Sequence, residues 1–221
     1  MKTPYKLLSG IALCLCMGSC SDRCSQEDFT DSERAIITHA DSMMRVLTIA
    51  DSLDNAVLRS TSRNLSASSL LSEEYSRLEQ LMVSTVTHPS QDGVGIAGPQ
   101  VGLNRRIAAV QRFDKDGEPF EVYPNIRIIW ASDSLAYGPE GCLSVPDRRG
   151  EVLRSQEIVI EYADIDRLRN SCCPEKSGNT GLKRRTAPEI PVRRDTVKGF
   201  TAVIFQHETD HLDGILYIDR L

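Results

Sequence analysis

The residues best suited to chemistry lie in the run QHETDH at residues 206–211. If this run is helical, His207 and His211 lie one turn apart on the same face, where two imidazoles can bind one metal ion. Glu208 would lie beside them and could move protons during a reaction. Such a site still needs a third protein ligand from elsewhere in the chain and an open position for water.

A helix is needed to place these side chains, and the spacing of apolar residues predicts one from Phe200 to His211. The ligand face of this helix continues an apolar stripe that should face the core. The stripe consists of Phe200, Val203, Ile204, His207 and His211. Gly214 is well placed to end the helix, because glycine readily adopts the left-handed conformation common at helix ends.

The remaining pattern predicts a helix at residues 73–85 and several short strands bounded by Gly, Pro, Asn or Asp. The expected strands cover residues 106–111, 120–123, 127–130 and 157–162, and residues 45–49 should be strand-like or extended. The order of these elements does not alternate as it would in a doubly wound sheet. We therefore expect an α+β fold, with small, mostly antiparallel sheets packed around a C-terminal metal-binding helix.

The third ligand could be a His, Cys, Asp or Glu. Asp213 and Asp219 follow the motif too closely to be good candidates, which directs the search upstream. There the chain contains GVGIAGPQ at residues 93–100 and EGCLS at residues 140–144. Together with the helical motif, and in this order, these segments closely resemble the three signature motifs of the peptide deformylases. The resemblance covers residues 43–221.

Carried over residue by residue, the resemblance implies that Cys142, His207 and His211 bind one divalent metal ion. Fe2+ is the ion that the family favours, while Zn2+, Ni2+ and Co2+ suit the same thiolate and imidazole ligands. A metal-bound water would be the nucleophile, and Glu208 would act as general base and then as general acid. The implied reaction removes the formyl group from N-formyl-methionyl peptides and releases formate.

The resemblance also implies which residues bind the peptide. Gln100 and the backbone N–H of Leu143 would hydrogen-bond the formyl oxygen as negative charge develops on it. The residues around the substrate would be Val94, Gly95, Gly141, Phe200, Val203 and Ile204, with an apolar pocket for methionine. Asp210 would anchor the helix. Arg149 and Arg154 lie where the family has arginines near the site, although structural ion pairs explain them equally well.

The N-terminal residues have the pattern of a bacterial lipoprotein signal. Lys2 and Lys6 precede an apolar run at residues 7–17, and small residues then precede Cys20. This pattern predicts a signal peptide at residues 1–19 and a lipid on Cys20. The protein would then be lipid-anchored to a bacterial membrane outside the cytosol, on the periplasmic side.

The predicted organisation continues with a polar tether at residues 20–42, in which a helix is the alternative around residues 32–44, and a deformylase-like domain at residues 43–221. A basic insertion at residues 167–194 interrupts this domain and reads as a solvated loop. Contact of the insertion with an anionic surface is the alternative. An internal start at Met43 or Met44 would give a cytoplasmic form instead.

Composition and length narrow the range of partners. The net charge of −5 argues against a nucleic-acid partner. No run approaches the roughly 18 apolar residues that a membrane span needs, so membrane contact is expected only through a lipid on Cys20. The chain ends soon after Gly214, so ribosome docking through a C-terminal helix is not carried over from the family. Two other functions stay open: a zincin-like metallopeptidase, and a lipid-anchored peptide-binding protein with reduced catalysis.

Overall fold

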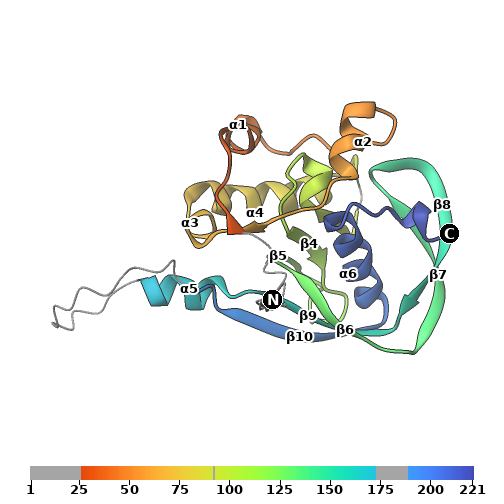
Figure 1. Ribbon diagram of the computed structural model, residues 1–221. Coiled ribbons are helices and arrows are strands. Elements are labelled where there is room, and N and C mark those ends of the chain that lie inside the picture. The colour runs from red at the N-terminus through yellow and green to blue at the C-terminus, as the bar shows by residue number, and fades with distance from the viewer. Residues whose placement is uncertain (1–25, 92, 173–188) are drawn as a thin grey trace, which may run out of the picture.

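The computed structural model describes residues 26–91, 93–172 and 189–221 (Figure 1). The signal peptide, Cys20 and residues 173–188 of the basic insertion lie outside the described residues, so the expectations for them stay predictions. Within the described ranges, every helix is too short or too polar to cross a membrane.

The chain forms an α+β fold, as the sequence predicts. Its helices are α1 (Asp31–His39), α2 (Ser52–Leu58), α3 (Ala67–Leu70), α4 (Glu73–Val86), α5 (Ile165–Cys172) and α6 (Gly199–Leu212), with short 3₁₀ helices η1 (Gly98–Val101) and η2 (Tyr217–Asp219). Its strands are β1 (Gln26–Glu27), β2 (Asn64–Leu65), β3 (Gly95–Ala97), β4 (Ile107–Gln111), β5 (Phe120–Pro124), β6 (Arg127–Ala131), β7 (Leu135–Cys142), β8 (Val145–Ser155), β9 (Glu157–Ala163) and β10 (Val192–Lys198). The predicted strands at 106–111, 120–123, 127–130 and 157–162 correspond to β4, β5, β6 and β9 within one residue at each end.

The strands form several small sheets rather than one large one. Two three-stranded antiparallel sheets have the orders β10-β9-β6 and β3-β4-β5, and β7 and β8 form an antiparallel hairpin. The short strands β1 and β2 pair in parallel. Because no sheet is large enough to form a core by itself, the helices between the sheets complete it.

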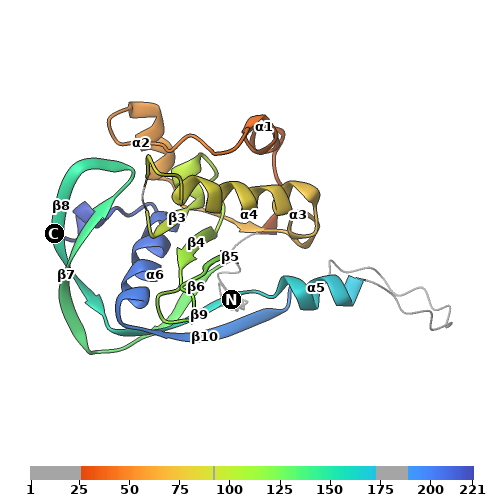
Figure 2. The ribbon, with the colours of Figure 1, turned by 180° about the vertical axis from the view of Figure 1, so that it is seen from behind.

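Helix α6 lies between the β3-β4-β5 sheet and the β7–β8 hairpin, as both ribbon views show (Figures 1 and 2). Its buried Ile204 and Phe205 join a hydrophobic cluster with Val110 of β4 and Ile160 of β9. Gly214 follows the helix with a φ of +74°, and a Cβ there would lie 2.5 Å from the carbonyl oxygen of Arg59. Glycine is therefore required at this position both for its backbone conformation and for space.

The β7–β8 hairpin is the main element that sequence analysis does not predict. Its strands contain Gly138, Pro139, Gly141 and Gly150, residues that weaken the signal for a strand. Both strands are largely exposed over much of their length, so the regular alternation of buried and exposed positions is missing. The hairpin nevertheless carries the EGCLS motif at its turn end.

Residues 45–49 are extended but join no sheet. The N–H of Leu47 donates to the carbonyl oxygen of Gln100 (2.8 Å), and the N–H of Ile49 donates to that of Ser144 (3.0 Å). Residues 45–49 therefore connect the GVGIAGPQ motif to the EGCLS motif through backbone hydrogen bonds.

Residues 26–42 belong to the folded body, although sequence analysis predicts a polar tether there. Thr30 and Glu33 form a capping box at the start of α1, and Phe29 and Ile37 are buried in the core beside α4. The buried Arg105 donates to both carboxylate oxygens of Glu33, at 2.7 Å each. The acidic composition of this segment conceals the two apolar residues that anchor it.

Candidate active site

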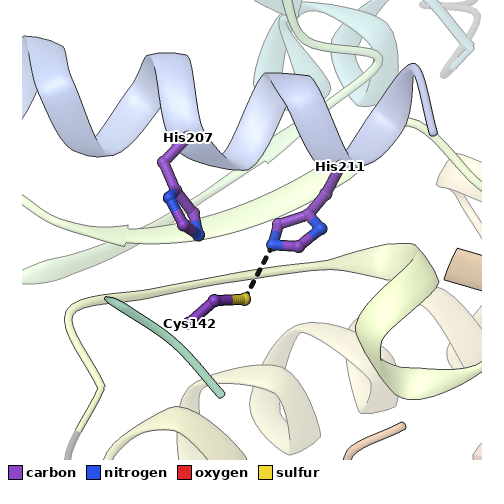
Figure 3. Close-up of side chains that lie close together, drawn as sticks. All are labelled: Cys142, His207 and His211. Carbon is purple, nitrogen blue, oxygen red and sulfur yellow. Dashed lines mark hydrogen bonds between the residues drawn. The ribbon is translucent and has the colours of Figure 1, made fainter. Parts of the chain in front are cut away.

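The structure brings the three predicted metal ligands together (Figure 3). His207 and His211 extend from one face of α6 toward Cys142, which ends β7. Cys142 Sγ lies 3.2 Å from His211 Nε2, and one ligand atom from each of the three residues lies within 4.8 Å of the others. A thiolate and two imidazoles at this spacing suit a transition-metal ion and leave a coordination position for water.

Cys142 reaches this position because of an irregularity in the hairpin. The pairing register shifts between Gly141 and Cys142, so that Cys142 pairs with Val145 across a tight turn. A register shift of this kind redirects a side chain out of the regular alternation. The thiol therefore points away from the β7–β8 hairpin and toward α6.

Glu140, whose role sequence analysis does not identify, supports the ligand His207. The Nδ1 of His207 lies 2.9 Å from Glu140 Oε2, and Arg154 donates to both Glu140 oxygens (2.8 and 3.1 Å). Burial alone would raise the pKa of Glu140, but hydrogen bonds from His207 and Arg154 lower it to about 2. A carboxylate that accepts the Nδ1 proton leaves Nε2 free to bind a metal.

Glu208 is buried in a different way, because one of its oxygens has no partner. Its side chain is 3% exposed, and Oε2 makes no hydrogen bond to any described residue. Burial raises the pKa of Glu208 to about 7, so the carboxylate is poised to exchange protons near neutral pH. A Cβ on Gly95 would lie 2.4 Å from Glu208 Oε1, which explains why glycine is needed at this point of β3.

Gln100 also lies at the site, and its orientation is set by local contacts. The N–H of Ala97 donates to Gln100 Oε1 (2.8 Å), which directs the amide nitrogen the other way. That nitrogen lies 3.5 Å from Cys142 Sγ and 3.3 Å from Ser144 Oγ. The side chain therefore presents an N–H2 group beside the ligand thiol. Leu143 lines the adjoining cavity, while the predicted role of its backbone N–H stays a prediction.

A cavity of about 720 Å³ opens in front of these groups. All the predicted substrate-binding residues line it: Val94, Gly95, Gly141, Phe200, Val203 and Ile204. Phe200 differs from expectation, because its side chain is 55% exposed rather than core-facing, with its ring 5.3 Å from that of Phe113. Phe200 is in the first turn of α6, where the helix leaves the core, so it forms the rim of the cavity.

The two arginines considered in the sequence occupy different environments. Arg149 lines the cavity, together with Arg148. Arg154 is buried, and besides Glu140 it donates to Asp210 Oδ2 at 2.7 Å. Arg154 therefore forms structural ion pairs behind the metal ligands. Through one of them, this residue of β8 fixes the side chain of Asp210 in α6.

Two imidazoles from one helix and a thiolate, beside a buried carboxylate and an open cavity, are the groups of a metal-dependent hydrolase. A family model described as polypeptide deformylase matches residues 43–173 and 191–221. The chain is 30% identical over 177 residues to the peptide deformylase of Leptospira biflexa, with 76% of this chain and 84% of that protein covered. It is 35% identical over 173 residues to peptide deformylase 2 of Gloeobacter violaceus, with 76% of each covered.

Solved structures give the same result. A Met-Ala-Ser-bound class I type b peptide deformylase from Acinetobacter baumannii superposes with a TM-score of 0.63 and 28% identity, covering 81% of this chain and 98% of that one. The peptide deformylase of Thermotoga maritima superposes with a TM-score of 0.62 and 26% identity, covering 82% and 99%. The chain belongs to the peptide deformylase family of hydrolases, and the resemblance noted in the sequence is confirmed.

Proposed function

We propose that this protein removes the formyl group from N-formyl-methionyl peptides and releases formate. The observation that carries this proposal is the unpaired, buried Glu208 beside three converging metal-ligand side chains and a peptide-sized cavity. A structural ion pair would leave no carboxylate oxygen without a partner, whereas a proton-transfer group needs one oxygen available.

A divalent ion held by Cys142, His207 and His211 would polarise the formyl group and make water more acidic. We propose Fe2+ as the native ion, on the family resemblance, with Zn2+, Ni2+ and Co2+ as ions that suit the same ligands. Glu208, with a pKa of about 7, accepts a proton from the attacking water and returns it to the departing amine nitrogen.

Gln100 and the cavity position the substrate for this proton transfer. The Gln100 N–H2 group, directed by the Ala97 contact, donates to the formyl oxygen as that oxygen gains charge. Val203 and Ile204 supply an apolar wall for the first side chain of the peptide. The Acinetobacter baumannii relative is bound to Met-Ala-Ser, a peptide that begins with methionine, which supports methionine in this position.

The test is to purify the full chain in detergent, without oxygen and with Fe2+, and to measure formate release from formyl-Met-Ala-Ser. We expect release by the wild-type protein and loss of release in Glu208→Ala, with the metal content of the variant unchanged. Folded, metal-loaded wild-type protein that releases no formate would contradict the proposal. Cleavage of the Met-Ala bond instead would identify the protein as a peptidase.

We also propose that Cys20 carries a lipid and places the enzyme on the periplasmic side of a bacterial membrane. The charged, apolar and small residues that precede Cys20 support this location. Growth with a labelled fatty acid should mark the wild-type protein and leave Cys20→Ser unmarked. Equal labelling of the two proteins would contradict lipid attachment at Cys20.

A further inference from the structure

Residues 215–220 lie against both elements that carry the metal ligands. After α6, Leu216 and Tyr217 are buried in a hydrophobic cluster with Val145 and Val152 of β8. The ligand Cys142 packs against the same cluster. The segment therefore contacts the hairpin that presents Cys142 while it remains covalently joined to the helix that presents the two histidines.

A continuous series of hydrogen bonds leads from this segment to a ligand. Arg220 donates through Nε and Nη2 to both oxygens of Asp210, at 2.5 Å each. Asp210 Oδ2 also accepts from Arg154 (2.7 Å), whose remaining donors bind Glu140. Glu140 in turn lies 2.9 Å from His207 Nδ1.

The three side chains between Arg220 and His207 are largely buried, so water cannot easily replace the hydrogen bonds that connect them. The side chains of Arg154 and Glu140 are only 4% and 5% exposed, and that of Asp210 is 11% exposed. In such surroundings a carboxylate cannot exchange its protein partner for water without a cost in free energy. Loss of the Arg220 contact would therefore let Asp210 and Arg154 shift, and the hydrogen bond that His207 Nδ1 donates to Glu140 would loosen.

Tyr217 supports the same ligand by direct contact. Its ring is stacked on the imidazole of His207, with 6.0 Å between centroids and an interplanar angle of 23°. The buried Tyr217 hydroxyl has no hydrogen-bond partner among the described residues. The aromatic ring, rather than the hydroxyl, is therefore what Tyr217 contributes.

We propose that residues 215–220 are a positioning element of the metal site, in which Arg220 and Tyr217 hold His207 in its ligating orientation opposite Cys142. The proposal rests on the metal-dependent function proposed above. Groups that orient a metal ligand from behind change metal affinity by about 10- to 100-fold when they are removed. Arg220 acts through two intermediate side chains, so we expect the lower end of this range, about tenfold.

The test measures metal retention rather than turnover. Metal-free full-length protein is loaded with one equivalent of Co2+, whose absorption reports the bound thiolate, and the loss of this absorption after addition of excess chelator is timed. We expect Arg220→Ala and Tyr217→Ala each to lose Co2+ about tenfold faster than the wild type. Arg220→Lys should restore part of the retention, and Tyr217→Phe should match the wild type because the ring remains.

Arg59→Ala is the matched control, because the Arg59 side chain hydrogen-bonds Asp219 on the same segment and reaches the ligand His211 through its charge alone, without a connecting hydrogen bond among the described residues. It should retain Co2+ as the wild type does, with thermal melting confirming that all variants are folded. If Arg220→Ala does not fold, the Tyr217→Ala and Tyr217→Phe pair still decides the question. Release at the wild-type rate in folded Arg220→Ala and Tyr217→Ala, or release from Arg59→Ala as fast as from these two variants, would overturn this inference alone. Wild-type protein that binds no Co2+ would overturn both this inference and the proposed function.

Discussion

Arg112 and Glu208 are both charged side chains buried beneath the surface, but their surroundings differ. Arg112 is 2% exposed, and its guanidinium donates to Asp114, Tyr123 and Asp195 while lying 5.7 Å from the ring centre of Phe205. Glu208 is 3% exposed, and its Oε2 has no partner among the described residues. The Arg112 guanidinium has hydrogen-bond acceptors around it, whereas burial of the Glu208 carboxylate with an unpaired oxygen costs free energy.

This difference separates residues that stabilise the fold from residues that perform chemistry. Native proteins pair nearly all of their buried polar groups, so a buried, unpaired carboxylate oxygen beside metal-ligand side chains points to a requirement other than stability. Arg112, directly after β4, pairs with Glu121 of β5 and Asp195 of β10. Glu208, in contrast, lines the cavity together with the predicted ligands Cys142 and His207.

The largest expected effect is that of Glu208→Gln on catalysis. Because the amide cannot accept the proton of water, kcat/KM for formyl-Met-Ala-Ser should fall about 10³-fold, or about 4 kcal/mol. The free energy of unfolding should not decrease, because the variant no longer buries an unpaired carboxylate. Formate release and urea unfolding measure the two quantities. A Glu208→Gln variant that loses stability but keeps its activity would show that Glu208, like Arg112, stabilises the fold rather than taking part in catalysis.

Arg112→Met should have the opposite profile. Removal of the guanidinium leaves the carboxylates of Asp114 and Asp195 without their buried partner, and the free energy of unfolding should fall by about 3 kcal/mol. The metal content and kcat/KM of the folded fraction should not change, because none of these residues lines the cavity. Urea unfolding with metal analysis tests this, and metal loss greater than the loss of folded protein would argue against a purely structural role.

Gly95→Ala tests how closely the fold must fit around Glu208. The new Cβ would lie 2.4 Å from Glu208 Oε1 and 2.9 Å from Ile204 Cγ2, so the carboxylate must move. We expect kcat/KM to fall about 30-fold, equivalent to about 2 kcal/mol, within the usual range for overpacking. Gly138→Ala is the control, since a Cβ there meets nothing within 4 Å. Equal activities for the two variants would show that the Glu208 position is not critical.

Phe200→Ala should have the smallest effect, because this side chain is at the exposed rim of the cavity. Loss of its partial contact with the peptide should raise KM about fivefold, or about 1 kcal/mol, while kcat stays nearly constant. Leu53→Ala, at a residue that is 78% exposed on α2, should leave both constants unchanged. A fall in kcat rather than a rise in KM would place Phe200 nearer to the reacting atoms than the structure indicates.

The parts of the molecule with local, periodic signals could be predicted from the sequence. Helix α6 spans Gly199–Leu212 against a predicted 200–211, and α4 ends at Val86 against a predicted 85. The β7–β8 hairpin could not be predicted in this way, and neither could the packing of α1 against the core, although a helix is an expected alternative around residues 32–44. Helix α1 has a single buried residue, Ile37, in a largely polar segment, and the glycines and Pro139 of the hairpin obscure the alternation typical of strands.

The supporting residues of the site show the same limit. Glu140 stands two residues before Cys142 in a recognisable motif, but nothing local indicates that its carboxylate meets His207. Arg154 and Arg220 are ordinary arginines in the sequence. Their roles depend on Asp210, which only the folded chain places between them.

The local geometry of this site follows from the order of the amino acids alone. The spacing of His207 and His211 places both imidazoles on one helix face, because an α-helix turns once every 3.6 residues. Cys142 stands 69 residues before His211, and its Sγ lies 3.2 Å from His211 Nε2 because the whole chain folds. The burial of Glu208, with Oε2 unpaired among the described residues, likewise depends on the complete fold. The reason is physical: backbone periodicity acts between neighbours, whereas burial and long-range contacts depend on how the whole chain packs.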